Sequence, residues 1–165
     1  MVSRTPRASS APAAVRSKTR VLVIEAPYYE NVAEELAAGA IAELEAAGAS
    51  CDRIIVPGAL EIPQALAQAI AADLIPGTYA GVIVLGCVIR GETSHYDVVV
   101  GQCNHWLYQL AIEHRIPLGN AVLTVDTEAQ ALARASGGRD GKGGDAARAC
   151  LSLIALGQTL SEKGA

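Results

Sequence analysis

Short apolar runs alternate with amphipathic segments along most of this chain, and this alternation limits the fold more than any other feature. Each of four apolar runs is nearly continuous, and a segment of helical length follows it. Such a run is typical of a strand buried on both faces, as in parallel sheets whose crossover helices cover both sides. The pattern therefore predicts an α/β fold, a three-layer α/β/α sandwich around a four-stranded parallel sheet.

The expected elements alternate until the last strand, which two helices follow. We expect strands at 20–25, 54–56, 79–89 and 118–125, and helices at 31–48, 61–72, 95–115, 128–135 and 144–160, with a glycine-rich turn at 136–144. In a parallel sheet the carboxyl ends of the strands share one edge, here called the carboxyl edge, and open α/β sheets bind ligands outside it. The turns after the four strands are therefore the places to search for a site.

The charge is distributed unevenly between the start of the chain and the rest. Residues 1–20 carry +5 and no acidic side chain, while the remainder carries −9. An acidic body argues against a nucleic-acid surface, so we expect no nucleic-acid partner. Residues 1–19 are interpreted as a disordered basic tail and 20–165 as one domain. A transit peptide is the alternative for the tail, but Pro6 and Pro12 disfavour the helix that it needs.

No run of 18 apolar residues occurs, and no apolar signal core lies near the start. We therefore expect no membrane span and a cytoplasmic protein. The four cysteines form no C-x-x-C pair, so buried thiols are favoured over zinc or redox chemistry. A metal on the three histidines is rejected, because His95, His105 and His114 point in different directions from one helix.

The apolar content is high for the size of the chain. Hydrophobic residues make up 51% of the sequence, yet only 4% is aromatic and phenylalanine is absent, so Ala, Val, Leu and Ile must form the core. The expected helix 95–115 carries apolar residues on more than one face, and such a helix needs cover beyond its own sheet. Burial of helix faces against other subunits is therefore one interpretation, and a monomer is the other.

The segment G86-C-V-I-R-G-E-T-S-H-Y-D97 combines a strand end, a polar turn and a helix start. Amides near the amino end of a helix carry partial positive charge and bind phosphate or another small anion. Thr93 or Ser94 could cap this helix, and His95 could exchange a proton near neutral pH. The alternative is a capped helix with no ligand.

The other turns carry weaker signals, each with a structural alternative. Glu61 could accept hydrogen bonds from a polyhydroxylated ligand, or only complement the helix dipole. Tyr28 and Tyr29 could stack on a flat heterocycle or pack in the protein. Arg134 and Lys142 could pair with an anion or remain solvated.

Three stretches together resemble the lumazine synthase family, the 6,7-dimethyl-8-ribityllumazine synthases of riboflavin biosynthesis. They are V56-P-G-A-L-E-I-P63, the 86–97 segment, and N120-A-V-L-T124 with E128-A-Q-A-L-A-R-A135. The resemblance runs from about residue 20 to the end and implies a flavodoxin-like fold. It also implies condensation of 5-amino-6-(D-ribitylamino)uracil with 3,4-dihydroxy-2-butanone 4-phosphate, with release of phosphate and water and without cofactor or metal.

The resemblance implies a role for each matching residue. Tyr28 would stack on the pyrimidine. The ribityl chain would contact Ala59, Leu60 and Glu61, and the backbone of Cys87, Val88 and Ile89 would bind the pyrimidine edge. Glu92, Thr93 and Arg134 would hold the phosphate, His95 would donate the proton, and Lys142 would lie near the pyrimidine. The family also implies a homopentamer or a multiple of it, with active sites between neighbouring subunits.

The chain departs from the family pattern in two places. Pro27 and Tyr29 stand where members commonly have arginine and asparagine, and Asn120, expected at the rim of the site, replaces an aromatic residue that closes the pocket. A weakly active or inactive ligand-binding or shell-forming homologue is therefore a second hypothesis. A flavin or nucleotide carrier is a third, but the turn after the first strand is not a phosphate-binding loop.

Overall fold

The computed structural model describes residues 15, 16 and 18–164, and their centre is one sheet of four strands. The strands are β1 (Arg20–Glu25), β2 (Ser50–Ile55), β3 (Gly81–Ile89) and β4 (Leu118–Val125). Their order across the sheet is β2-β1-β3-β4, and every neighbouring pair is parallel. The predicted four-stranded parallel sheet is therefore confirmed.

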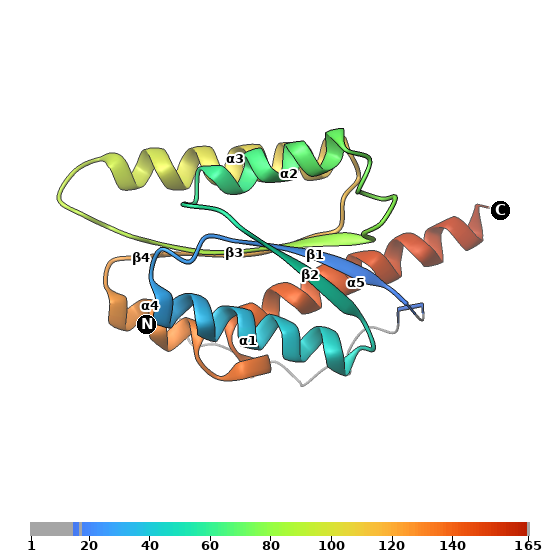
Figure 1. The fold of residues 1–165 in the computed structure, drawn as a ribbon, viewed down its shortest axis with the longest axis horizontal. Helices are drawn as coiled ribbons and strands as arrows, with labels where there is room; N and C mark the ends of the chain where they lie inside the picture. Colours follow the sequence, from blue (N-terminus) through green and yellow to red (C-terminus); the bar gives the residue numbers. More distant parts are fainter. Residues whose placement is uncertain (1–14, 17, 165) are drawn as a thin grey trace.

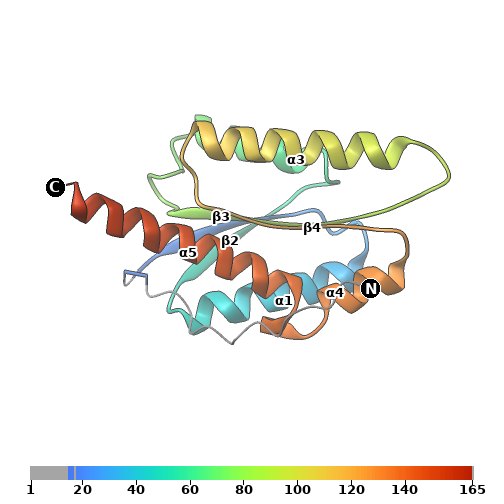
Figure 2. The same cartoon turned by 180° about the vertical axis from the view of Figure 1, so that it is seen from behind.

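Two layers of helices enclose this sheet (Figures 1 and 2). The helices are α1 (Glu30–Ala46), α2 (Glu61–Ala71), α3 (His95–Glu113), α4 (Glu128–Ala135) and α5 (Lys142–Lys163), with a 3₁₀ turn η1 (Gly138–Asp140). Helices α2 and α3 cover one face, while α1, α4 and α5 cover the other. The α/β/α sandwich is confirmed, and the carboxyl edge lies at the left of Figure 1.

The strands divide the core into two aliphatic clusters by simple alternation. In β1, Val21 and Val23 pack toward α1 and α5, while Leu22 and Ile24 pack toward α2 and α3. All four are at most 1% exposed. Each face of the sheet thus receives every second side chain, which is why a continuous apolar run is needed here.

Strand β2 is longer than the sequence predicted, because it lies at the edge of the sheet. It begins at Ser50 and not at Ile54, and its first residues include Asp52 and Arg53. An edge strand has one side open, so charged side chains are tolerated there and discourage pairing with other chains. Arg53 binds the buried carboxylate of Glu25 on β1, with 2.7 Å between Nη2 and Oε1.

Helix α5 starts earlier than predicted, at Lys142, and the glycines at its start explain the difference. A Cβ added to Gly143 would lie 1.9 Å from the carbonyl oxygen of Leu36 on α1. One added to Gly144 would lie 2.0 Å from the carbonyl oxygen of Arg139. These glycines therefore permit close packing of α5 on its neighbours and do not interrupt the helix. The 136–144 turn is correspondingly shorter and contains η1.

The described part of the expected tail is small. Most of residues 1–19 lies outside the described residues, so the predicted disorder of the tail stays a prediction. Arg16 forms an ion pair with Glu162 on α5 at 3.0 Å, and Val15 packs against the core cluster of the α1 side. Within residues 18–164 no helix combines the length and the apolar content that a membrane span requires.

Candidate active site

The site begins where β3 extends beyond β1. Strand β1 ends at Glu25, opposite Leu85, whereas β3 continues to Ile89 and pairs there only with β4. The segment Cys87–Ile89 therefore has a backbone edge on the β1 side that no strand among the described residues covers. Unpaired peptide N–H and C=O groups on such an edge can bind a planar heterocycle by hydrogen bonds.

The turn 90–94 joins this strand end to α3, and Arg90 holds it in place. Its guanidinium lies 3.4 Å from a carboxylate oxygen of Asp97 and 3.3 Å from one of Asp126. It also stacks 4.0 Å from the ring centre of Tyr96, and its backbone N–H donates to the carbonyl of Val125. The ends of β3 and β4 and the start of α3 are thus connected by one side chain.

Arg90 was assigned no role from the sequence, although a local signal exists. Asp97 lies seven residues after Arg90, in the first turn of α3. This spacing lets the Arg90 guanidinium at the end of the strand reach the Asp97 carboxylate at the start of the helix. The pairing with Asp126 connects separate strands and has no such local signal.

The predicted anion-binding residues are exposed on this turn. Glu92, Thr93 and His95 all face solvent, and His95 is the first residue of α3. The His95 amide donates to Oγ1 of Thr93 at 3.3 Å, so Thr93 and not Ser94 supplies the side-chain acceptor at this helix start. The remaining amides at the amino end are suited to an anion.

Glu61 is held at the start of α2 by the turn that follows β2. Its amide donates to the carbonyl of Gly58 at 3.1 Å, and a Cβ on Gly58 would lie 3.0 Å from Oε2 of Glu61. The glycine therefore leaves the space that the carboxylate occupies. Ala59 and Leu60, which complete this turn, are half-buried.

The two tyrosines after β1 have different environments. Tyr28 is 72% exposed and touches Tyr29 edge to face, with 5.1 Å between the ring centres. Tyr29 packs against the core, and its burial, followed by the nearby Cys87, raises the pKa of its phenol. Tyr28 is thus free to stack on a ligand, and Tyr29 is a packing residue.

Cys87 is a buried thiol, as predicted. Its side chain is 8% exposed, and burial, with a smaller contribution from Glu128, raises its pKa to about 11. A thiol with such a pKa is protonated at neutral pH and is a poor nucleophile. It lines a small hollow at the carboxyl edge that leaves no room for a water molecule.

We expected Asn120 at the rim of the site, but in the structure it does not lie at the carboxyl edge of its own chain. It is the third residue of β4 and pairs with Val84, whereas the carboxyl end of the strand is at Val125. Its Nδ2 donates to Oδ1 of Asn104 on α3 at 2.9 Å, and its Oδ1 accepts from the amide of Val122. Since β4 begins at Leu118, Asn120 must lie near its amino end.

Lys142 and Arg134 lie on the other face of the sheet from Asn120. Gly119 faces α5, because an added Cβ would meet the Ala146 carbonyl, so Asn120 points toward α3. Lys142 opens α5 and donates to Asp145, while Arg134 on α4 donates to its own helix at the Gln130 carbonyl. Figure 2 shows β4 between α3 and α5. Asn120 and the helix that carries Lys142 therefore lie on opposite faces of the sheet at β4.

Comparison with known proteins decides between the possible families. A family model described as 6,7-dimethyl-8-ribityllumazine synthase matches residues 18–158. The chain belongs to the 6,7-dimethyl-8-ribityllumazine synthase family. All the candidate site residues fall within the matched span.

Similar members of this lumazine synthase family cover nearly the whole chain. The 6,7-dimethyl-8-ribityllumazine synthase of Methylobacterium radiotolerans is 52% identical over 94% of this chain and 94% of its own length. That of Azorhizobium caulinodans is 53% identical over 94% and 96%. The 6,7-dimethyl-8-ribityllumazine synthase 1 of Rhodopseudomonas palustris is 46% identical over 88% and 90%.

Proposed function

We propose that the protein condenses 5-amino-6-(D-ribitylamino)uracil with 3,4-dihydroxy-2-butanone 4-phosphate to 6,7-dimethyl-8-ribityllumazine, the penultimate step of riboflavin biosynthesis. The observation that carries this proposal is the carboxyl edge at β3. An uncovered backbone edge for a heterocycle lies directly before a helix start for a phosphate, within a chain of the matching family. The 5-amino group condenses with the ketone with loss of one water, phosphate is eliminated, and attack of the ribitylamino nitrogen closes the ring with loss of a second water.

The uracil substrate binds over the ends of β1, β2 and β3 in this proposal. Tyr28 stacks on the ring, because its exposed face is available. The backbone of Cys87, Val88 and Ile89 binds the polar edge of the ring, and the Glu61 carboxylate accepts hydrogen bonds from ribityl hydroxyls. The half-buried Ala59 and Leu60 line the ribityl chain.

The phosphate of the second substrate binds at the start of α3. Amides of Glu92 and Thr93 donate to its oxygens, and Arg134 adds a cation that can bind two oxygens at once. His95 lies beside this site and gives a proton to the leaving group or takes one from the amine. Since the reaction needs two substrates held together, proximity supplies most of the acceleration. In this proposal no metal or cofactor takes part.

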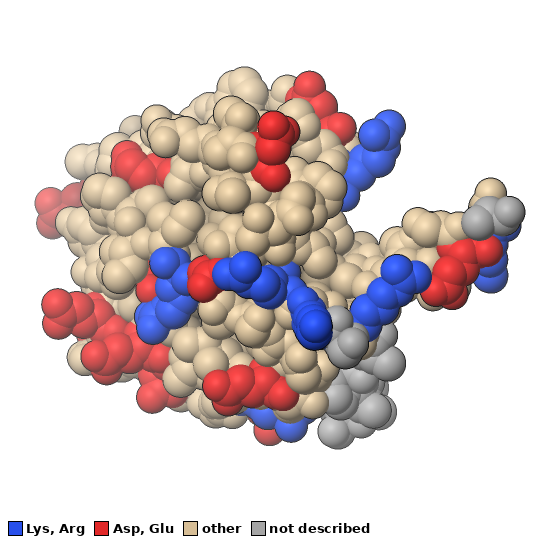
Figure 3. Space-filling model, turned by 45° about the vertical axis from the view of Figure 1, so that its right-hand side comes forward, with Lys and Arg blue, Asp and Glu red and all other residues tan. Residues whose placement is uncertain are grey.

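The active site is completed by a second copy of the chain. Asn120 lies near the amino end of β4, away from the carboxyl edge of its own chain. In this proposal it therefore contributes to the site of a neighbouring chain, and Lys142 of the same copy reaches the uracil substrate bound there. Helix α3 presents exposed apolar side chains at Val98, Trp106, Tyr108 and Ile112. Figure 3 shows few charged side chains over the layer of α2 and α3 on the face in view. We propose a homopentamer or a multiple of it, with the number taken from the family resemblance.

The proposal is tested by mixing the two purified substrates with the protein. We expect growth of the lumazine absorbance, with phosphate released in equal amount. Binding of both substrates without turnover would instead support the hypothesis of an inactive ligand-binding homologue, which the departures at Pro27, Tyr29 and Asn120 motivate. The cytoplasmic location stays a prediction that fractionation of the source cells tests.

A further inference from the structure

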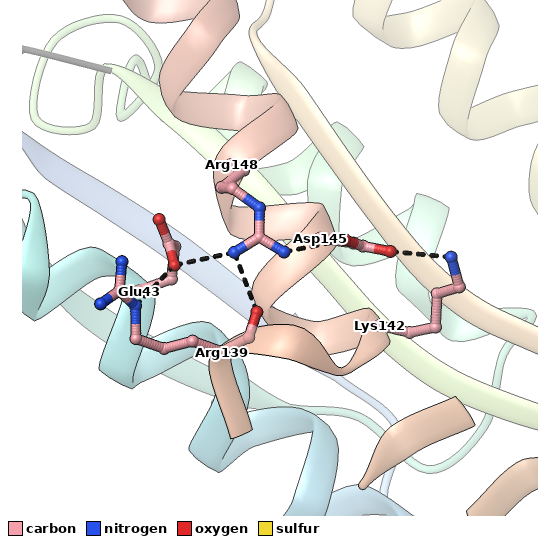
Figure 4. Close-up of polar contacts among 5 residues, drawn as sticks. All are labelled: Glu43, Arg139, Lys142, Asp145 and Arg148. Atoms are coloured by element: carbon pink, nitrogen blue, oxygen red, sulfur yellow. Dashed lines mark hydrogen bonds and ion pairs between the residues drawn. The ribbon is translucent and has the colours of Figure 1, made fainter. Parts of the chain in front are cut away.

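A chain of charged hydrogen bonds runs from Glu43 on α1 to Lys142 at the start of α5 (Figure 4). Oε2 of Glu43 accepts from Nε of Arg139 at 2.8 Å and from Nη1 of Arg148 at 2.9 Å. Nη2 of Arg148 donates to Oδ1 of Asp145 at 2.8 Å. Oδ2 of Asp145 accepts from Nζ of Lys142 at 2.7 Å. Three separate segments are connected in this way.

The buried end of this network is poorly explained by stability alone. Glu43 is 0% exposed, and its Oε1 has no hydrogen-bond partner among the described residues. Buried ion pairs contribute little net stability because both partners lose their hydration, and an unpaired buried oxygen adds a further penalty. What such a network does provide is a defined geometry for the charged groups that it connects.

Arg148 transmits this geometry from Glu43 to Asp145. Its planar guanidinium places two nitrogens on two different carboxylates, and Nη1 also donates to the Arg139 carbonyl at 2.9 Å. Burial alone would raise the pKa of Asp145, but hydrogen bonds from Lys142 and Arg148 hold that pKa below its ordinary value. Asp145 is therefore ionised at neutral pH and holds one cation on each oxygen.

The network ends in one surplus positive charge that ligands can reach. Counted over the described residues, its two carboxylates and three cations leave a net charge of +1, and the Lys142 side chain is one-third exposed. An ammonium group has three N–H donors, and the contact with Asp145 uses one of them. The remaining donors suit an oxygen of a ligand.

We propose that Glu43 and Arg148 are positioning residues, which fix the Lys142 ammonium through Asp145 for contact with an oxygen of the uracil ring. This inference rests on the proposed function, in which Lys142 of one copy reaches the uracil substrate bound by its neighbour. Glu43 itself touches no substrate and acts only through the orientation of Lys142.

Steady-state kinetics of Glu43→Gln test the inference, because the amide keeps the shape and removes the charge. The apparent KM for the uracil should rise about fivefold, the loss expected for one misplaced charged hydrogen bond. The KM for the butanone phosphate and kcat should change less than about twofold, since neither depends on this contact. Glu45→Gln, on an exposed position of the same helix, is the matched control and should change nothing.

A double-mutant cycle with Lys142→Ala separates positioning from stability. In the Lys142→Ala background, Glu43→Gln should raise the uracil KM no further. An equal rise in both backgrounds would overturn the inference, because Glu43 would then act without Lys142. If Glu43→Gln does not fold, Arg148→Lys serves in the same cycle, since a lysine cannot span both carboxylates.

The cycle also distinguishes failure of the inference from failure of the proposed function. If Lys142→Ala leaves the uracil KM of an active enzyme unchanged, the proposed role of Lys142 is wrong and the inference falls with it. If the unmodified protein does not turn over, the proposed function itself is wrong. An additive cycle in an active enzyme overturns only the roles of Glu43 and Arg148.

Discussion

His95 is the first residue of α3, and its imidazole is exposed beside the amides of the turn after β3. We expect His95→Ala to slow turnover by about 10²-fold or less, because proton transfer adds to a rate that proximity mainly sets. The measurement is kcat with both substrates saturating. His114→Ala, at the far end of the same helix, is the control and should be active. Complete loss of turnover with binding intact would show that His95 does more than move protons.

Because Gly58 has no side chain, the Glu61 carboxylate can lie close to it. A Cβ added to Gly58 would be 3.0 Å from Oε2 of Glu61. We expect Gly58→Ala to fold, because a flexible side chain can move aside, but to displace this carboxylate. The KM for the uracil substrate should then rise about threefold to tenfold, the effect of one weakened charged hydrogen bond. Gly157→Ala, where a Cβ meets nothing within 4 Å, is the control. An unchanged KM would exclude Glu61 from ribityl binding.

Arg134 is exposed on α4, and among the described residues its guanidinium pairs only with a carbonyl of its own helix, so its cation is available to a ligand. Arg134→Ala should raise the KM for the butanone phosphate about tenfold or more, since a guanidinium–phosphate contact is charge-assisted. Binding of the uracil substrate, measured by titration, should be nearly unchanged. Lys163→Ala removes a positive charge at the end of α5 and is the control. Collapse of uracil binding would show that Arg134 belongs elsewhere in the site.

At the scale of elements, local pattern predicted most of the fold. The bounds of β4 and α4 agree with those expected, because a buried apolar run and an N-capped amphipathic helix are both local signals. The edge position of β2 and the close packing of the glycines in α5 depend on other segments, so local pattern predicted both elements but set their starts too late.

The candidate site divides in the same way. The turn from Arg90 to His95 lies where an apolar strand must end and a helix begin, so its place at the carboxyl edge could be predicted. The pairing of Arg90 with Asp126 and the network around Glu43 join residues far apart in sequence, and no periodicity indicates them. The predicted position of Asn120 at the rim was wrong, because a motif match does not show how far a residue lies from the end of its strand.

Three elements carry buried thiols that affect stability at high pH. Burial raises the pKa of Cys87 on β3 and of Cys103 on α3 to about 11, and that of Cys150 on α5 to about 12. In the unfolded chain these thiols ionise near pH 8.5. Because the pKa of each thiol is higher in the folded state, its stabilising contribution is fully present below about pH 8.5. This contribution is lost as the pH rises toward 11–12.

We therefore expect the free energy of unfolding to fall above pH 8.5, by up to about 1.4 kcal/mol per pH unit for each buried thiol. Urea unfolding at pH 7.5 and pH 10, at fixed protein concentration with reductant, measures this slope. Cys103→Ala should lower stability at pH 7.5 yet flatten the slope, while Cys51→Ala, at a half-exposed thiol, should change the slope less. An equal slope in all three proteins would contradict the assignment.

Across the whole of the described chain, an apolar surface on α3 is left exposed. The exposed side chains of α3 include Tyr108 at 49% and Ile112 at 78%, one turn apart on the helix. Asn120, which we propose for the site, lies near the amino end of β4 and not at the carboxyl edge of its own chain. Both features are explained together if copies of the chain associate through α3 near the carboxyl edge.

We expect the purified protein to be a pentamer or a multiple of it by light scattering, and the variant Tyr108→Glu/Ile112→Glu to dissociate. In an isolated chain two charges at exposed positions would change little, so loss of assembly would report a contact between copies. Turnover should fall with the assembled fraction, because a monomer lacks the neighbour's contribution. Ala38→Glu/Ala46→Glu adds the same charge to exposed positions of α1 and should assemble normally. A stable monomer with full activity would contradict both the assembly and the shared site.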